Sequence, residues 1–176
     1  MAGSSGPAPA GADVLGETRQ YLTFNLASET FALGILAIKE IIEYNAPTAV
    51  PMMPEYLRGV INLRGLVVPV IDLAVRFGKA STAVTKRTCI VIVEIGIDGE
   101  RHDVGVVVDA VNAVIEIAPQ DIEPPPSFGT RIRTEFIAGM GKVNGRFMML
   151  IDPQHVLAAG ELEALAGSSL ESAAAA

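Results

Sequence analysis

An eighteen-residue stretch occurs twice in this chain, eighty positions apart. Residues 56–73 read YLRGVINLRGLVVPVIDL, and residues 136–153, FIAGMGKVNGRFMMLIDP, align with them without a gap. In each copy two apolar runs flank a short turn, Arg64-Gly65 in the first and Asn144-Gly145 in the second, and glycine allows the positive φ that such turns need. The pattern predicts a β-hairpin in each copy.

The similarity continues towards the N-terminus of both copies. The sequence FALGI at 31–35 resembles HDVGV at 102–106, an offset of 71, and IIE at 41–43 resembles VIE at 114–116, an offset of 73. A predicted strand and turn precede these matches in each copy, and a proline-marked loop follows them. Two copies of about 70 residues predict two similar small subdomains.

The strands of each copy are expected to close on themselves. The chain is rich in valine and isoleucine, which favour strands. Five short strands left as an open sheet would expose two edges, and closure into a small barrel removes them. We therefore expect an all-β fold of two five-stranded β-barrels side by side, with aliphatic side chains packed inside each and between them.

The barrels are expected to follow one another along the chain. Both ends are rich in small residues, and residues 77–87 are small and polar, which is typical of a linker. Short helical turns are predicted near 35–41 and 51–58. The expected division is a disordered tail (1–18), a first barrel (19–78), a linker (79–87), a second barrel (88–153), a C-terminal helix (154–166) and a disordered tail (167–176).

Composition excludes several classes of function. A net charge of −7 argues against nucleic acid as a partner, because phosphate binding needs a basic surface. No apolar run reaches the roughly 18 residues of a membrane span, and the N-terminus lacks the basic and apolar regions of a secretory signal. The lone Cys89 excludes an internal disulfide and a cysteine-rich metal site. We expect a soluble cytoplasmic protein without direct membrane insertion.

No motif in the chain predicts catalysis, a cofactor or a metal. The glycines of GMGKVNG at 139–145 resemble a dinucleotide fingerprint, but that motif must open a helix, and here it contains a hairpin turn. The two histidines, His102 and His155, lie in unrelated contexts. Asp72 and Asp152 are equivalent in the repeat, and each is predicted to cap the turn that follows its strand rather than to form a carboxylate dyad.

Charges that differ between the copies indicate where binding residues lie, since structural residues should recur in both. Arg64 corresponds to Asn144, Arg58 corresponds to Ala138, and Glu40 has an uncharged counterpart among residues 111–113. Free variation of surface charge is the alternative explanation for any one of them. Arg64 is the strongest candidate, because an arginine on a turn can bind a partner carboxylate through two hydrogen bonds.

At these residues the chain resembles the CheW family of bacterial chemotaxis adaptors. The resemblance covers about residues 20–165, and it is carried by LAIKEI at 36–41, RGVINLRG at 58–65, VPVID at 68–72, GVVVD at 105–109 and GMG at 139–141. It implies two SH3-like barrels around a shared hydrophobic interface and no enzymatic activity. It also implies a role in joining the cytoplasmic tips of chemoreceptors to the regulatory domain of the histidine kinase CheA, with other CheW copies as further neighbours in receptor arrays.

The resemblance implies a receptor-binding site and no cofactor. Carried over by position, the receptor-binding residues are Ile38, Glu40, Gly59, Asn62, Leu63, Arg64 and Gly105. The kinase-binding surface is not assigned, because no sharp motif marks it. The alternative is a small β-barrel module that binds a ligand or nucleic acid, which the acidic charge and the scarcity of aromatic residues for stacking disfavour.

Overall fold

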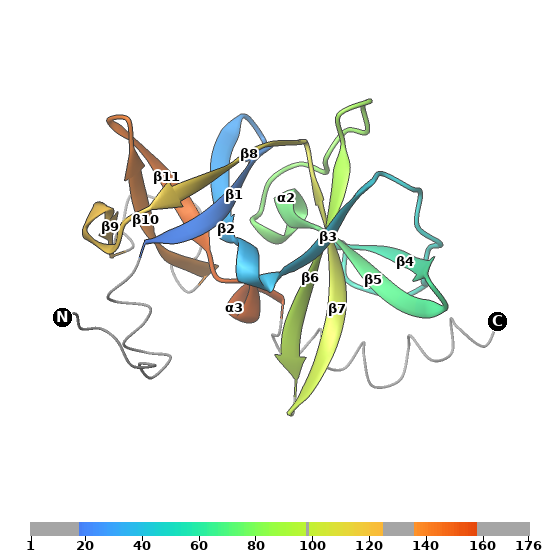
Figure 1. The fold of residues 1–176 in the computed structure, drawn as a ribbon. Helices are drawn as coiled ribbons and strands as arrows, with labels where there is room; N and C mark the ends of the chain where they lie inside the picture. The colour runs from blue at the N-terminus through green and yellow to red at the C-terminus, as the bar shows by residue number, and fades with distance from the viewer. Residues whose placement is uncertain (1–17, 98, 125–135, 158–176) are drawn as a thin grey trace.

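The structure, a computed structural model, describes residues 18–97, 99–124 and 136–157 (Figure 1). Strands form most of this part of the chain. The elements are β1 (Arg19–Leu26), β2 (Glu29–Gly34), η1 (Ile35–Ala37), β3 (Ile38–Glu43), β4 (Leu57–Leu63), β5 (Leu66–Asp72), α2 (Leu73–Arg76), β6 (Cys89–Ile97), β7 (Glu100–Val108), β8 (Ala110–Ile117), η2 (Pro119–Asp121), β9 (Ile122–Glu123), β10 (Ile137–Val143), β11 (Arg146–Ile151) and α3 (Pro153–Leu157).

The strands form two sheets, which confirms the all-β fold of two SH3-like barrels. The first barrel has the order β3-β6-β7-β5-β4, and the second has the order β8-β1-β2-β11-β10-β9. Thr48, which follows β3, exchanges backbone hydrogen bonds of 2.8 and 2.9 Å with Val60 of β4, and so joins the two ends of the first sheet. In the second barrel β9 follows β8 and pairs with β10 in the same way.

The strands do not follow the expected sequential division into 19–78 and 88–153. The hairpin β1–β2 belongs to the second barrel, and the hairpin β6–β7 belongs to the first. The first barrel therefore combines three strands of the first copy with the first hairpin of the second. The second barrel combines four strands of the second copy, the two-residue β9 among them, with the first hairpin of the first copy, so it has six strands rather than the expected five. The repeat shows which strands are equivalent, but it contains no information on which copy a strand pairs with, and this exchange is the reason for the difference.

The pairing within the two hairpins confirms the eighty-residue repeat. Leu57 pairs with Ile71 and Gly59 with Val70 across an irregular step, and the second hairpin shows the same step after Ile137. Both turns have positive φ at both central residues, 54° and 86° in the first and 53° and 77° in the second. These values fit the type I′ turn that favours hairpins.

The part of the repeat that contains β2 and β3 has a single offset of 73 residues from its counterparts β7 and β8. Val70 pairs with Gly105, and its counterpart Leu150 pairs with Ala32, so Ala32 corresponds to Gly105. The expected offset of 71 for this strand was wrong, because it matched Gly34 to Gly105. The bulge in β3 before Glu40 recurs in β8 before Ala113, which identifies Ala113 as the counterpart of Glu40.

The buried core has three parts. The largest lies between the barrels, and a smaller one fills each barrel. Successive residues of β6 point alternately into the core of the first barrel and into the core shared by both barrels. Ile90 and Ile92 lie inside the first barrel, and Val91 and Val93 lie in the shared core. This explains why β6 is apolar on both faces.

Most of the predicted core is buried, and two local predictions need correction. Leu33, Val68, Val70, Val106, Val108 and Leu150 are buried. Ile35 is only half-buried, because it lies in η1 where the chain crosses from one barrel to the other. Residues 51–52 and 55–56 form turns instead of the predicted helix, and β4 begins at Leu57.

The expected C-terminal helix is described only in part. Helix α3 spans Pro153–Leu157, and residues 158–166 of the expected helix lie outside the described residues. Residues 1–17 of the expected N-terminal tail and the tail 167–176 lie outside them as well.

Candidate functional site

Glu40 and Arg64 form an ion pair between the two end strands of the first sheet. Glu40 lies on β3 and Arg64 in the turn after β4, and these strands are the two ends of the first sheet. Arg64 Nη2 donates to Glu40 Oε1 at 2.8 Å, and Arg64 Nη1 donates to the other carboxylate oxygen. The arginine side chain is 71% exposed, so this two-pronged pair is presented at the surface.

The ion pair keeps both groups charged. The hydrogen bond from Arg64 lowers the pKa of Glu40, and the hydrogen bond to Glu40 raises the pKa of Arg64. Exposed pairs contribute little to stability, because water and salt screen them. The fold therefore has little need of these two side chains, and a partner can compete for either charge.

Asn62 and Leu63 position the turn that carries Arg64. The side chain of Asn62 accepts a 2.9 Å hydrogen bond from the backbone N–H of Gly65, which ties the turn together. Leu63 is half-buried against the core of the first barrel. Ile38, at the start of β3, packs in the same partial way against the shared core.

Gly59 and Gly105, the other two predicted receptor-binding residues, are buried. A Cβ atom on Gly59 would lie 2.2 Å from the carbonyl oxygen of Thr48, at the bridge that closes the first barrel. A Cβ on Gly105 would lie 2.8 Å from Ile90 Cγ2, inside the barrel. At both glycines the backbone therefore packs closely against its neighbours. These two residues are buried, unlike the exposed Asn62 and Arg64 of the predicted receptor-binding set.

Asp72 is the centre of a buried polar cluster that the sequence revealed only in part. As predicted, it caps the next helix by accepting from the N–H groups of Ala74 and Val75. Its carboxylate also accepts from the Arg58 Nε and the Ser81 hydroxyl, at 3.0 and 2.9 Å. The charge on Arg58, absent from the second copy, serves this cluster.

The cluster fixes the expected linker 79–87 to the first barrel. The N–H of Thr82 donates to Asp72 at 3.0 Å, and Arg58 Nη2 donates to the carbonyl oxygen of Thr82 at 2.5 Å. Burial by itself would raise the pKa of Asp72. The hydrogen bonds from Thr82, Ser81 and Arg58 outweigh that effect and hold the pKa below its usual value.

Asp152 has the predicted capping role, and no such cluster surrounds it among the residues that the structure describes. It accepts from the N–H groups of Gln154 and His155 at the start of α3, and His155 Nδ1 lies 2.5 Å from its carboxylate. It is half-buried, whereas Asp72 is 1% exposed. The two aspartates thus serve separate helices.

The described residues contain no metal centre and no dinucleotide site at the glycine motif. No group of three or more His, Cys, Asp or Glu side chains among them could hold a metal ion. GMGKVNG forms β10 and a hairpin turn, which is not the geometry of a dinucleotide site. Burial raises the pKa of the Cys89 thiol, which disfavours the reactive thiolate.

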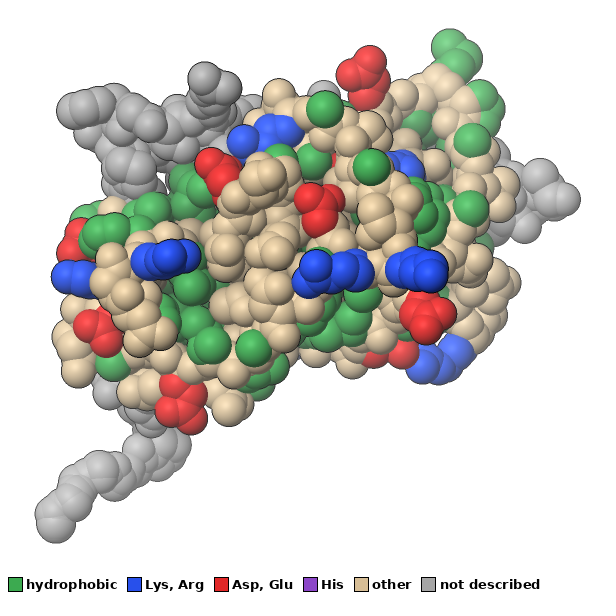
Figure 2. All heavy atoms as spheres, turned by 90° about the horizontal axis from the view of Figure 1, so that it is seen from above, with side chains coloured by type: hydrophobic (Ala, Val, Ile, Leu, Met, Phe, Trp, Pro, Cys, Tyr) green, Lys and Arg blue, Asp and Glu red, His purple; other side chains and the backbone are tan. Residues whose placement is uncertain are grey.

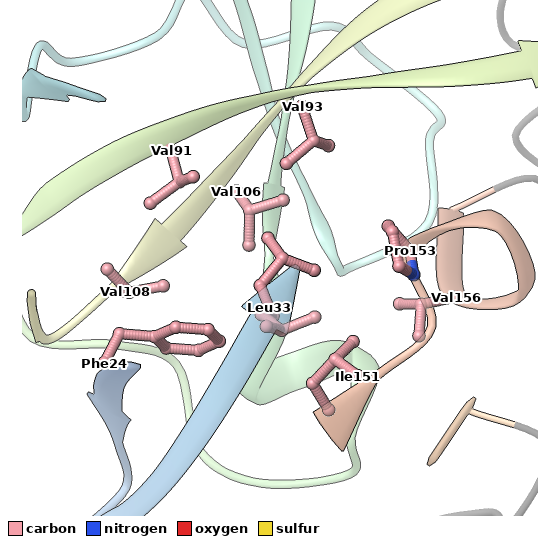
Figure 3. Close-up of a pocket in the computed structure, with 10 residues that line it drawn as sticks. Phe24, Leu33, Val91, Val93, Val106, Val108, Ile151, Pro153 and Val156 are labelled. Atoms are coloured by element: carbon pink, nitrogen blue, oxygen red, sulfur yellow. The ribbon is translucent and has the colours of Figure 1, made fainter. Parts of the chain in front are cut away.

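The space between the barrels is too small for a ligand. Figure 3 shows apolar side chains of both barrels converging on it, among them Phe24, Val93 and Ile151. Its free volume is about 10 Å³. That is about the space of one water molecule, and an apolar site of this kind offers water no partner.

The surface in Figure 2 shows basic side chains lying among acidic and apolar ones rather than in one continuous patch. This face therefore lacks the concentrated positive charge that nucleic acid binding requires. No helix in the described part of the chain is long and apolar enough to span a bilayer.

Comparison with known proteins identifies the family. The sequence model of the CheW-like domain matches residues 20–161. Chemotaxis protein CheW of Klebsiella aerogenes is 33% identical over 149 residues, covering 84% of this chain and 87% of that protein. Chemotaxis protein CheW of Rhizobium meliloti is 31% identical over 146 residues, covering 83% and 92%.

A solved structure agrees with these relatives. The scaffolding protein TtCheW from Thermoanaerobacter tengcongensis matches with a TM-score of 0.73 and 36% identity, covering 82% of this chain and 96% of that one. The match extends over both barrels. The chain belongs to the CheW family of chemotaxis scaffold proteins.

Proposed function

We propose that this protein is a non-enzymatic adaptor that couples chemoreceptors to the histidine kinase CheA. The observation that carries the proposal is the exposed Glu40–Arg64 pair, which the first copy has and the second copy replaces with Ala113 and Asn144. The equivalent hairpin forms without these charges, so their presence in one copy fits a binding role better than a structural one.

The receptor-binding surface consists of exposed and half-buried residues around this pair. Glu40 and Arg64 supply charge, and Ile38 and Leu63 supply apolar area beside it. Asn62 holds the turn in place. Gly59 and Gly105 act indirectly, by allowing the close backbone packing that shapes the barrel.

The partners are the cytoplasmic tips of the receptors and the regulatory domain of the kinase, with other CheW copies as neighbours in arrays. The protein would then work at the cytoplasmic side of a membrane that its receptors cross. A ligand-binding module, the alternative function, gains no support from the small apolar space between the barrels.

A three-component binding experiment tests this function. Purified protein is mixed with a receptor-tip fragment, with the kinase regulatory domain, and with both together, and the complexes are separated by size. The proposal expects both binary complexes and a ternary complex that contains all three components. Binding to only one partner, or mutual exclusion of the two, would contradict an adaptor role.

A further inference from the structure

A chain of ion pairs crosses β3, β6 and β7, which are neighbours in the first sheet. Lys39 on β3 donates a hydrogen bond from Nζ to Asp103 Oδ2 on β7 at 3.3 Å, and the same Nζ lies 3.9 Å from Glu94 Oε2 on β6. Arg101 on β7 donates from Nη1 to Glu94 Oε1 at 2.7 Å. One acidic residue on β6 therefore joins two cations from the strands on either side of it.

This chain of ion pairs adjoins the Glu40–Arg64 pair. Lys39 is the extra residue of the bulge in β3, and it separates Ile38 from Glu40. The hydrogen bond from Arg64 is the main cause that lowers the pKa of Glu40, and the positive charge of Lys39 lowers it further. The two sets of charges therefore share one surface of the first barrel.

The cations of this surface are more exposed than its carboxylates. The exposed fractions are 47%, 71% and 79% for the side chains of Lys39, Arg64 and Arg101. They are 27%, 28% and 15% for those of Glu40, Glu94 and Asp103. A partner therefore meets positive charge first, although the chain as a whole carries a net charge of −7.

The equivalent place in the second barrel has neutral side chains. Asn112 is the extra residue of the bulge in β8, as Lys39 is in β3. Its Nδ2 donates to Asn25 Oδ1 at 3.0 Å, and the Thr30 hydroxyl donates to the same oxygen at 3.4 Å. Asn25 and Thr30 pair across β1 and β2 as the two acidic residues do across β6 and β7. The second barrel thus forms with neutral hydrogen bonds here, so the fold does not require the charges of the first.

Arg101 lies where the β6–β7 hairpin extends beyond the length of its counterpart. The pairing of β1 with β2 ends at Leu26 and Glu29. These positions correspond to Ile95 and His102, and the pairing of β6 with β7 continues past them to include Arg101. The extension adds an exposed cation at a place that the β1–β2 hairpin does not reach.

The spacing of these charges indicates the kind of partner. The strands that carry Lys39 and Arg101 lie on either side of β6, roughly 10 Å apart. The carboxylate of Glu94 lies between the two cations, and it would repel the closely spaced phosphates of a nucleic acid. Separate acidic side chains on a protein segment can each approach one cation, because ammonium and guanidinium groups carry several N–H donors.

We infer that Lys39 and Arg101 extend the receptor-binding surface across β3, β6 and β7, and that this surface selects a receptor segment with spaced Asp or Glu side chains. The inference rests on the proposed function, which supplies the receptor as the partner. Charges at an interface act on specificity and on the rate of association more than on affinity. The two cations thus favour receptors whose tips are acidic at this place over those that are neutral or basic there.

The test is titration of a receptor-tip fragment with Lys39→Gln, Arg101→Gln and the double variant, at low and high salt. Each single change should weaken binding about threefold at low salt, as expected for exposed ion pairs, and the double variant about tenfold. High salt should weaken the binding of wild-type protein more than that of the double variant. Lys142→Gln, at an exposed lysine on β10 of the second barrel, is the matched control and should change neither affinity nor salt dependence.

Two further samples separate the charges from the fold and identify the partner groups. Lys39→Asn combined with Asp103→Thr leaves the net charge unchanged and introduces the neutral side chains of the second barrel. This variant should melt within about 4 °C of wild type and still bind the fragment about threefold more weakly. A receptor fragment whose surface Asp and Glu are replaced by Asn and Gln should bind wild-type protein and the double variant equally.

Any other pattern overturns the inference. Unchanged receptor affinity in the double variant would show surface ion pairs without a binding role, and an equal loss in Lys142→Gln would show an effect of overall charge. A loss for the kinase regulatory domain alone, or for self-association alone in sedimentation, would assign the surface to another partner. If wild-type protein binds no receptor fragment, the proposed function fails and the inference with it, which the titration of the unaltered protein reveals separately.

Discussion

Arg76 donates a hydrogen bond from Nε to the carbonyl oxygen of Val156 at 3.1 Å. Val156 occupies the position in the second copy that Arg76 occupies in the first, eighty residues earlier. The same guanidinium lies 4.8 Å from the ring centre of Tyr56 and 4.9 Å from that of Phe136, which are also counterparts. One side chain thus contacts equivalent groups of both copies, at the place where α2 and α3 meet the shared core.

Arg76→Met should destabilise the protein by about 2 kcal/mol, since it removes two cation–π contacts and a charged hydrogen bond while keeping an apolar chain. Chemical denaturation measures the change. Arg101→Met is the control, because Arg101 is 79% exposed and pairs with Glu94 at the surface. Equal losses in the two variants would show that Arg76 does not join the copies.

Asp72→Asn should cost about 3 kcal/mol, because it leaves Arg58 half-buried without its counter-charge and weakens the bonds to residues 81 and 82. Asp152→Asn keeps the oxygen that caps α3, because asparagine caps a helix about as well as aspartate does, and its cost should be below about 1 kcal/mol. Urea unfolding of both variants provides the comparison. A cost for Asp152→Asn as large as that for Asp72→Asn would contradict the importance of the cluster.

The stability of the protein should also depend on pH through Asp72. Its pKa in the folded state lies below its ordinary value, so the unfolded state binds the proton more tightly. The stabilisation is fully present above the unfolded pKa of about 3.9 and is lost as the pH falls through the folded pKa. Unfolding free energy followed from pH 6 down to pH 2 should decline more steeply in wild-type protein than in Asp72→Asn. Parallel curves would show that Asp72 has no such shift.

Gly59→Ala should reduce stability by more than about 3 kcal/mol, because the new Cβ would meet the backbone of Thr48 and the φ of 142° strains any side chain. Gly34→Ala is the matched control, since the nearest atom to its Cβ would be 4.0 Å away. Thermal unfolding compares the two. A stable Gly59→Ala variant that has lost only receptor binding would return Gly59 to the contact surface.

The hairpins, their turns and the aspartate caps could be predicted because local patterns determine them. Asn144-Gly145 has a turn preference of its own, and an aspartate after a strand caps whatever turn follows. The exchange of hairpins between barrels could not be predicted, because the apolar sequence pattern of β1 is the same whether the strand pairs with β3 or with β8. The predicted offset of 71 near Gly34 was wrong for a related reason. It rested on a local match of Gly34 to Gly105, whereas the pairing of β2 with β11 makes Ala32 the counterpart of Gly105.

The candidate site was predictable in part for the same reasons. Comparing the copies singled out Arg64 and Glu40, and the structure brings them together. It also singled out Arg58, which instead binds Asp72 within the β4–β5 hairpin, in a cluster that Ser81 and Thr82 complete.

The most direct test of the adaptor account is titration of wild-type and Arg64→Ala protein against a receptor-tip fragment and, separately, against the kinase regulatory domain. Arg146→Ala, an exposed arginine beside the equivalent turn of the second copy, is the control. The account predicts that Arg64→Ala loses about 2 kcal/mol of receptor affinity, roughly thirtyfold, as arginines at interface centres do. Kinase affinity and melting temperature should stay near wild-type values, and Arg146→Ala should change nothing. Unchanged receptor affinity in Arg64→Ala, or an equal loss for both partners, would contradict the account.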